Sequence, residues 1–300
     1  MNSFFGIFLG LAPSFGLILL GGVIGRRLQQ GVWQGIDKLN FEILFPALIF
    51  SAAASRHITF SQLFTIAPTV WAIMLFGLVI GWSSRRFGPE SFLDFAGSWQ
   101  TAWRFNTAIA FVAISVSDRA DVAVMAITIG LAVPLANILA VTALSRGGNL
   151  SLKATVWKIV SNPFLIASIA GVIVGLSGVE VPPLMMAPIY MLAKAAIPIA
   201  LLSIGAIMNW SALGKIDAFS AILNATKLII SPALVLITAW VLGVSGPLVA
   251  TLVIFAALPT ASAAHVLASA FGADREQVAT IIAQSTVISA ITLPIWMSLI

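Results

Sequence analysis

Seven stretches of this chain contain no Asp, Glu, Lys or Arg, and each is about as long as a membrane span or longer. A helix of roughly 20 apolar residues crosses the hydrocarbon core of a bilayer. The stretches are Met1–Gly25, Ile58–Ser84, Val122–Ser145, Ile159–Val179, Ala195–Gly214, Leu228–Ala273 and Gln277–Ile300. The sixth is long enough for two spans. The pattern therefore predicts an all-α polytopic membrane protein.

Composition indicates the same class of protein. The chain is 60% hydrophobic and 8% charged, whereas soluble domains average about 25% charged residues. It has no cysteine, which excludes disulfides, thiolate nucleophiles and cysteine-bound metals. The net charge of +5 does not indicate nucleic-acid binding, because the basic residues lie at span ends rather than along one face. Since Arg26 and Arg27 follow the first apolar run, we expect a retained helix there and not a signal peptide.

Apolar runs separated by polar breaks predict ten membrane helices with short connections. The predicted ranges are 4–25, 36–54, 63–83, 95–116, 121–143, 159–179, 184–208, 219–242, 247–271 and 277–299. Of the 15 Lys and Arg residues, ten lie in connections after odd-numbered helices and two after even-numbered ones. Because cytoplasmic connections carry the excess of basic residues, we expect both termini on the outer side of the cell (inner) membrane.

The two halves of the chain carry similar landmarks at nearly constant spacing. Pro13, Gly21 and Gly25 recur 150 residues later as Pro163, Gly171 and Gly175, and other landmarks recur at offsets of 152 and 156. Helices 1–5 and 6–10 are therefore interpreted as two copies of one unit. Because five is an odd number, the second copy enters the membrane from the opposite side, as in the inverted repeats of secondary transporters.

Polar groups interrupt the fourth and ninth predicted helices near their centres. At an offset of 156 residues, Arg104 matches Thr260 and Asn106 matches Ser262. Pro259 lacks a backbone donor, so we expect it to break its helix and leave carbonyl groups without helical partners. Such backbone is tolerated inside a membrane only where protein or a cavity satisfies it. The sequence thus predicts a binding site near the bilayer midplane.

The chemistry of this site favours an anion. Half-helix N-termini carry partial positive charge, and the planar guanidinium of Arg104 matches a carboxylate. A second interpretation stays open, in which Arg104 lies nearer the cytoplasmic end and either snorkels or bridges to Asp94.

Other polar residues inside the predicted spans have two interpretations each. Glu42 and Lys194 occupy equivalent positions, so they could form a pair or carry a coupling proton, or they could anchor helix ends at the interface. His265 could titrate or pack through a hydrogen bond. Lys227 lies within two turns of a helix start and is expected to snorkel. Hydrogen bonding between helices is expected for Asn137, Gln284, Ser285 and Thr286, and close helix packing for the pairs Gly21/Gly25 and Gly171/Gly175.

No catalytic or nucleotide-binding motif is present: the chain lacks HExxH, GxSxG, GxxxxGK[ST] and GxGxxG patterns. We therefore expect no enzyme activity, no cofactor and no ATP-driven pump.

Several segments carry a family resemblance across essentially the whole chain. They are APSFGLILLGGVIGRR, LNFEILFPALIFS, RFNT, SNPFLIASIAGVIVG, IPIALLSIGA and ALPTASAAHVLASAFGAD. With these motifs in this order, the chain resembles bacterial members of the auxin efflux carrier family, which are related to plant PIN auxin exporters.

The resemblance implies two inverted five-helix repeats, residues 1–144 and 145–300. Helices 1, 2, 6 and 7 would form a scaffold, and helices 3–5 and 8–10 a moving transport domain, as in an elevator. The family's crossover of broken helices falls on helices 4 and 9. Its binding residues correspond here to Asn106, Thr107, Pro259, Thr260 and Ser262.

The family's substrates are organic anions, including auxin and small mono- or dicarboxylates such as malate and malonate. The resemblance leaves coupling to protons or sodium open, and by analogy helices 2 and 7 offer a homodimer surface. One departure is that many relatives carry a proline just after the Asn-Thr pair, where this chain has Val112 and Ala113. Helix 4 is therefore expected to be broken less sharply than helix 9.

The sequence thus predicts a secondary carrier for small organic anions, with Arg104 attracting or pairing the carboxylate. The alternative is a sodium- or proton-coupled carrier of the bile-acid-transporter type with a different organic substrate. A membrane sensor and a membrane-embedded enzyme are weaker alternatives, because the sequence has no output domain and no acid–base pair at one depth.

Overall fold

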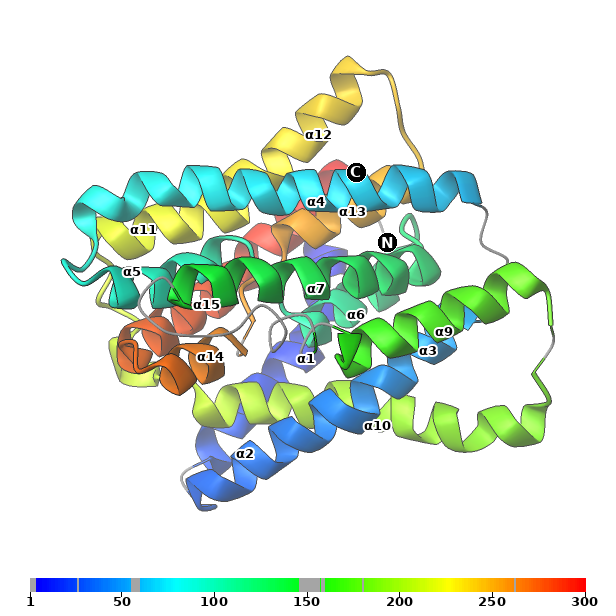
Figure 1. The fold of residues 1–300 in the computed structure, drawn as a ribbon, viewed down its shortest axis with the longest axis horizontal. Helices are drawn as coiled ribbons and strands as arrows, with labels where there is room; N and C mark the ends of the chain where they lie inside the picture. The colour runs from blue at the N-terminus through cyan, green and yellow to red at the C-terminus, as the bar shows by residue number, and fades with distance from the viewer. Residues whose placement is uncertain are drawn as a thin grey trace.

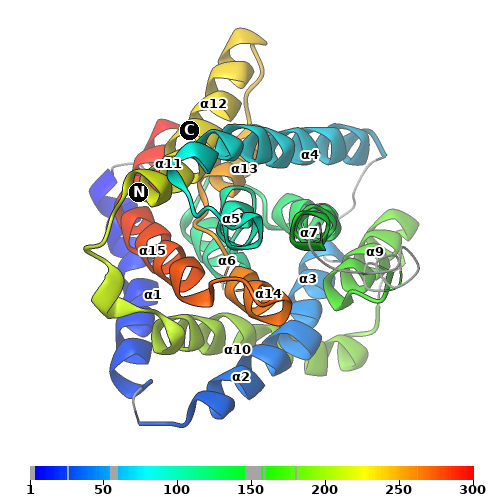
Figure 2. The same cartoon turned by 60° about the vertical axis from the view of Figure 1, so that its left-hand side comes forward.

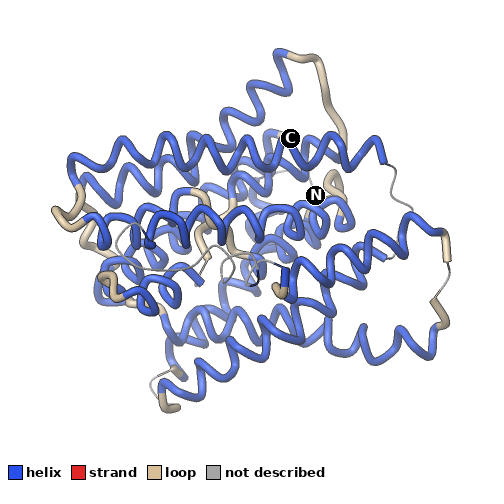
Figure 3. Tube along the Cα trace, in the orientation of Figure 1, coloured by secondary structure: helices blue, strands red, loops and turns tan. Residues whose placement is uncertain are grey.

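The computed structural model describes residues 4–25, 27–54, 60–145, 157, 160–179, 181–261 and 263–300. This part of the chain consists of helices and their connections and contains no β-strand (Figures 1 and 3). The prediction of an all-α protein is confirmed.

The elements, in chain order, are α1 (Phe4–Ile24), α2 (Gln30–Leu39), the π-helical turn η1 (Asn40–Leu44), α3 (Phe45–Ala54), α4 (Phe60–Trp82), the 3-10 turn η2 (Ser83–Phe87), α5 (Phe92–Trp99), the 3-10 turn η3 (Gln100–Ala102), α6 (Thr107–Val116), α7 (Val122–Ser145), α9 (Pro163–Ser177), α10 (Pro183–Ile207), the 3-10 turn η4 (Trp210–Ala212), α11 (Ala218–Ala225), the π-helical turn η5 (Thr226–Ile230), α12 (Ser231–Val241), α13 (Pro247–Ala257), α14 (Ala263–Phe271) and α15 (Arg275–Leu299).

Six helical segments of the described chain are long and apolar enough to cross a membrane. They are α1, α4 with η2, α7, α10, the continuous run from α11 to α12, and α15. Two further apolar helices, α9 and α13, are shorter. The protein is therefore a multi-pass membrane protein, as the charge-free stretches predicted.

Local sequence fixes several of these helix ends. Asn162 and Asp274 cap α9 and α15, because each side chain accepts hydrogen bonds from backbone N–H groups of the first turn. Proline stands at the first position of α9, α10 and α13, where its missing N–H would have no helical partner anyway. The second predicted helix begins earlier than expected, at Gln30, because the polar residues before position 36 continue the helix as α2.

Two helix pairs approach closely through glycine. A Cβ atom on Gly21 of α1, or on Gly25 just after it, would collide with the backbone of α10 at Leu202 or Ala206. A Cβ on Gly171 of α9 would likewise collide with α3. The predicted role of both glycine pairs in packing is thus confirmed for these three residues, since small residues let membrane helices meet without gaps.

Three of the short helices lie between longer ones (Figure 2). Figure 2 shows α5, α6 and α14 near the centre, surrounded by longer helices that include α1, α7, α10 and α15. All side chains of α6 from Ala108 to Ile114 are buried. The N-terminal end of α6 lies inside the protein at the buried Asn106, so its unpaired backbone groups must find partners there.

Candidate functional site

The helical path is interrupted twice in the interior of the bundle. It ends at Ala102 and resumes at Thr107, and it ends again at Ala257 and resumes at Ala263. Residue 262 lies outside the described residues, so Ser262 cannot be placed. The breaks fall in the fourth and ninth predicted helices, where the polar interruptions predicted them.

Proline causes the second break. The residue before a proline avoids the α conformation, and Leu258 is accordingly extended, with φ −63° and ψ 143°. Pro259 itself has no N–H to continue the helix.

The first break has a different cause, and it is as complete as the second. The expectation that it would be less sharp, because no proline follows Thr107, is wrong. Asn106 has an extended backbone, and its side-chain oxygen accepts a hydrogen bond from the Ile109 N–H at 3.1 Å. An asparagine N-cap of this kind starts a new helix, so four residues before Thr107 remain without helical structure.

The two breaks contact each other although about 150 residues separate them in sequence. The backbone N–H of Asn106 donates to the carbonyl of Pro259 at 2.9 Å. The rings of Phe105 and Phe255 lie 4.7 Å apart between centroids. The side-chain amide of Gln100 donates to the carbonyl of Ala264 at 3.1 Å. Each interrupted segment therefore supplies partners for backbone groups of the other.

The site residues predicted from sequence converge at this contact. Arg104, Asn106, Pro259 and Thr260 are buried, and Thr107 is partly buried. The Thr260 N–H donates to Ser285 on α15 at 3.4 Å, but its hydroxyl has no hydrogen-bond partner in the structure. A buried polar atom without a partner is uncommon in native proteins and calls for an explanation.

Arg104 points into the protein rather than to the membrane surface. Its side chain is 5% exposed, and one terminal nitrogen donates to the side-chain oxygen of Asn137 on α7 at 3.1 Å. Its Nε has no hydrogen-bond partner among the residues that the structure describes. The interpretation in which Arg104 snorkels or bridges to Asp94 is wrong, because the residue is buried and its guanidinium bonds Asn137, while Asp94 accepts from the Asp274 N–H at 2.8 Å. The guanidinium thus retains donors for a ligand.

Lys227 is the residue that sequence reasoning missed. The prediction that it snorkels is wrong: its side chain is 3% exposed, and Nζ donates to the carbonyl of Ala256 at 3.0 Å. Lys227 lies in the π-helical turn η5, whose wider turn shifts the direction of the following side chains. Two features of the sequence could have indicated that Lys227 is buried. It lies about 12 Å into the predicted helix that begins at residue 219, and that helix contains no carboxylate.

Hydrogen bonds between helices were expected from four polar residues of the fifth and tenth predicted helices, which are α7 and α15. They are confirmed for three of these four residues. Asn137 bonds Arg104, Gln284 accepts from Asn224 on α11, and Ser285 accepts from Thr260. The hydroxyl of Thr286 instead donates to Ile282, one turn back on its own helix.

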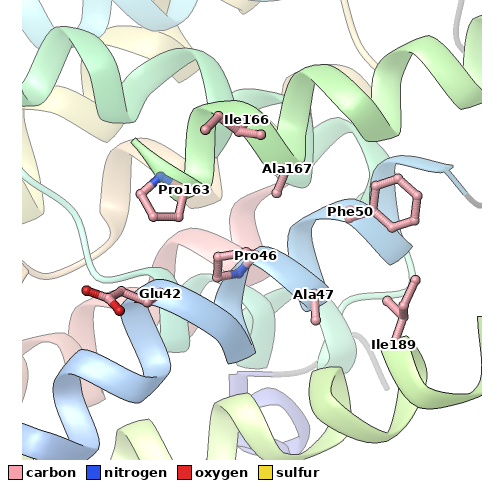
Figure 4. A pocket seen from close by; sticks show the side chains of 8 residues that line it. All are labelled: Glu42, Pro46, Ala47, Phe50, Pro163, Ile166, Ala167 and Ile189. Atoms are coloured by element: carbon pink, nitrogen blue, oxygen red, sulfur yellow. The ribbon is translucent and has the colours of Figure 1, made fainter. Parts of the chain in front are cut away.

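The other charged candidates do not join the two breaks. Glu42 is exposed, and its Oε1 lies 3.9 Å from Nζ of Lys38. Of the two interpretations for Glu42 and Lys194, the one in which they pair with each other is therefore wrong, and Lys194 is also exposed. Glu42 instead lines an open groove of about 390 Å³ between α3, α9 and α10, with no residue of either break in its lining (Figure 4). His265 is partly buried on α14. The described residues contain no cluster of His, Asp and Glu able to hold a metal ion.

Comparison with known proteins identifies the family. The family model described as "Membrane transport protein" matches residues 148–297, half of the chain. The chain belongs to this auxin efflux carrier family. It is therefore a membrane transporter and not an enzyme.

Two relatives illustrate the range of the family. The transporter is 26% identical over 295 residues to a protein of Rhizobium meliloti named "Putative malonate transporter", an alignment that covers 93% of this chain and 91% of the relative. It is 32% identical over 105 residues to an "Uncharacterized transporter" of Methanothermobacter thermautotrophicus, which covers 35% of each chain.

Proposed function

We propose that this transporter is a secondary carrier for small organic anions and that the substrate binds where the two broken helices meet. The observation that carries the proposal is the 2.9 Å backbone hydrogen bond from Asn106 to Pro259. It joins two interruptions from opposite halves of the chain in the protein interior. Discontinuous helices that meet in this way form the substrate sites of many secondary transporters.

An anion fits the electrostatics of this junction. Helices α6 and α14 both begin at the breaks, and the N-terminus of a helix attracts negative charge. Arg104 adds a full positive charge with an unused donor at Nε. The unpartnered Thr260 hydroxyl can donate to a carboxylate oxygen. In this proposal Asn106, Thr107 and Ser262 complete the lining.

The packing of the long helices supports two inverted repeats, residues 1–144 and 145–300. The repeat offset relates α1 to α9 and the α2–α3 run to α10. The close contact of α1 with α10 then has a counterpart in the close contact of α9 with α3. In this proposal these four helices form the scaffold, which could also provide a homodimer surface.

The remaining helices form the transport domain in this proposal, and they carry both breaks through the membrane by elevator motion.

Ile7 and Ile300 line one small cavity, so the two ends of the described chain lie close together. That agrees with an even number of spans and with termini on one side, which the basic residues assign to the outside of the cell membrane.

Uptake into proteoliposomes tests the substrate class. Radiolabelled malonate, malate and an indole acid are offered to the purified, reconstituted transporter, with protein-free liposomes as the baseline. We expect uptake of at least one dicarboxylate above baseline. Thr260→Ala is expected to reduce it, while Thr128→Ala, which removes another buried hydroxyl without a partner from α7, is expected to leave it unchanged. Uptake equal to baseline for every anion would refute the proposal.

The bile-acid-transporter type remains the alternative. It would be favoured if uptake of a larger organic substrate required sodium or a proton gradient while malonate and malate were ignored.

A further inference from the structure

Lys227 of η5 is a buried cation that contacts the end of another helix, α13, and the proposed function does not use it. Its Nζ donates to the carbonyl of Ala256 at 3.0 Å and lies 5.8 Å from the centroid of the Phe255 ring. Ala256 is the second-last residue of α13 and precedes Pro259 by three positions. The ammonium therefore lies at the C-terminal end of α13, beside the break.

This helix end needs a positive partner. The last four carbonyl groups of an α-helix have no helical hydrogen bond, and together they carry about half a negative charge. Residues 250–260 are all buried, so bulk water does not solvate this end. The ammonium of Lys227 both donates a hydrogen bond and neutralises the partial charge.

The buried charges of the described chain are both positive. Among the charged side chains that the structure describes, Arg104 and Lys227 are buried, whereas every Asp and Glu is partly or fully exposed. Lys227 thus has no buried carboxylate as a counter-charge within the described chain. Its partners there are a carbonyl and the face of an aromatic ring, both of which attract cations.

Secondary transporters with broken helices often bind a coupling cation at this kind of place, because half-helix C-termini and unwound carbonyls coordinate Na⁺. We infer that Lys227 takes the place of such a cation at the C-terminal end of α13. This inference rests on the proposed carrier function and deepens it. The transport cycle then needs no sodium, since the positive charge at the break is covalently attached.

Cation replacement tests the inference. Malonate uptake is measured in proteoliposomes with NaCl, KCl or N-methylglucamine chloride at equal ionic strength. Wild-type uptake is expected to agree within about twofold among the three salts. Lys227→Ala is expected to lose uptake about tenfold or more in N-methylglucamine and to recover several-fold in NaCl. Lys227→Arg, which keeps the charge, and Lys215→Ala, which removes an exposed lysine, are expected to behave like the wild type.

Two results would overturn the inference: wild-type uptake that requires sodium, or a Lys227→Ala variant whose uptake is the same in all three salts. The second result counts when uptake by the variant is measurable, because a purely structural cap would show no cation dependence. Where uptake is absent in all three salts, the Tm measurement below decides.

A stability measurement covers the case in which Lys227→Ala does not fold. Lys227→Met keeps the packing of the apolar stem but ends one atom short of the ammonium, and its Tm is compared in NaCl and in N-methylglucamine chloride without substrate. Sodium is expected to raise the Tm of the variant by several degrees and to leave the wild type unchanged, and an unchanged variant would refute the inference. Because no substrate is present, the result stands even if the wild type transports no carboxylate and the proposed function fails.

Discussion

Replacing Arg104 with methionine separates ligand binding from folding. Methionine keeps an unbranched apolar stem and removes the charged guanidinium. The substitution leaves the Asn137 side-chain oxygen without the donor that it has at 3.1 Å, which costs about 1–3 kcal/mol. It also removes the desolvation cost of a buried guanidinium, and replacing a buried charge by an apolar group is often neutral or stabilising. We therefore expect the free energy of unfolding without ligand to change by less than about 2 kcal/mol.

The effect on binding is expected to be larger. Two charge-assisted hydrogen bonds from the guanidinium to a carboxylate contribute about 3 kcal/mol, which corresponds to a roughly 100-fold change in Kd. At a malonate concentration of about 100 times the wild-type Kd, the ligand stabilises the wild type by about 2.7 kcal/mol. A 100-fold weaker variant at the same concentration gains only about 0.4 kcal/mol.

The assay is a thermal-shift measurement of purified protein with and without malonate. The matched control is Arg85→Met, which removes an arginine that bonds backbone carbonyls of Pro89 and Glu90, outside both breaks. We expect the malonate-induced rise in Tm to disappear in Arg104→Met and to persist in Arg85→Met. A full rise in Arg104→Met would refute the role of Arg104 in binding the anion.

Three further predictions test the site, the packing and the topology. Thr260→Val removes a hydroxyl that has no partner, so its Tm without ligand should match the wild type while malonate affinity by calorimetry falls about tenfold; unchanged affinity would contradict the assignment. Gly205→Leu places side-chain atoms against the backbone of α1 and should lower the Tm through overpacking of about 1–3 kcal/mol, whereas Gly31→Leu, with open space around its Cβ, should not. Because the chain has no cysteine, an impermeant maleimide added to whole cells should label Arg119→Cys and spare Arg86→Cys, and the reverse pattern would invert the topology.

Much of the fold follows from the sequence because membrane helices are specified by apolar length. Charge-free stretches located the long helices, and Pro259 located one break from its missing donor. The glycine pairs were also informative, since a small residue on a helix face has few purposes other than close approach. The family resemblance then pointed to the same two interruptions as the site.

The remaining features depend on geometry that composition does not encode. Asn106 breaks its helix as a cap, and an asparagine is a weaker signal than a proline because it also occurs in uninterrupted helices. Lys227 is buried and lies in the π-helical turn η5, and no spacing in the sequence indicates that turn. Glu42 and Lys194 matched in the repeat, yet Glu42 has its cation one turn away at Lys38.

The bond that joins the two broken helices uses main-chain atoms only, an N–H from residue 106 and a C=O from residue 259. Any amino acid except proline at position 106 supplies the same donor. The side chains around this junction can therefore change during evolution while the backbone contact between the two halves of the chain is retained.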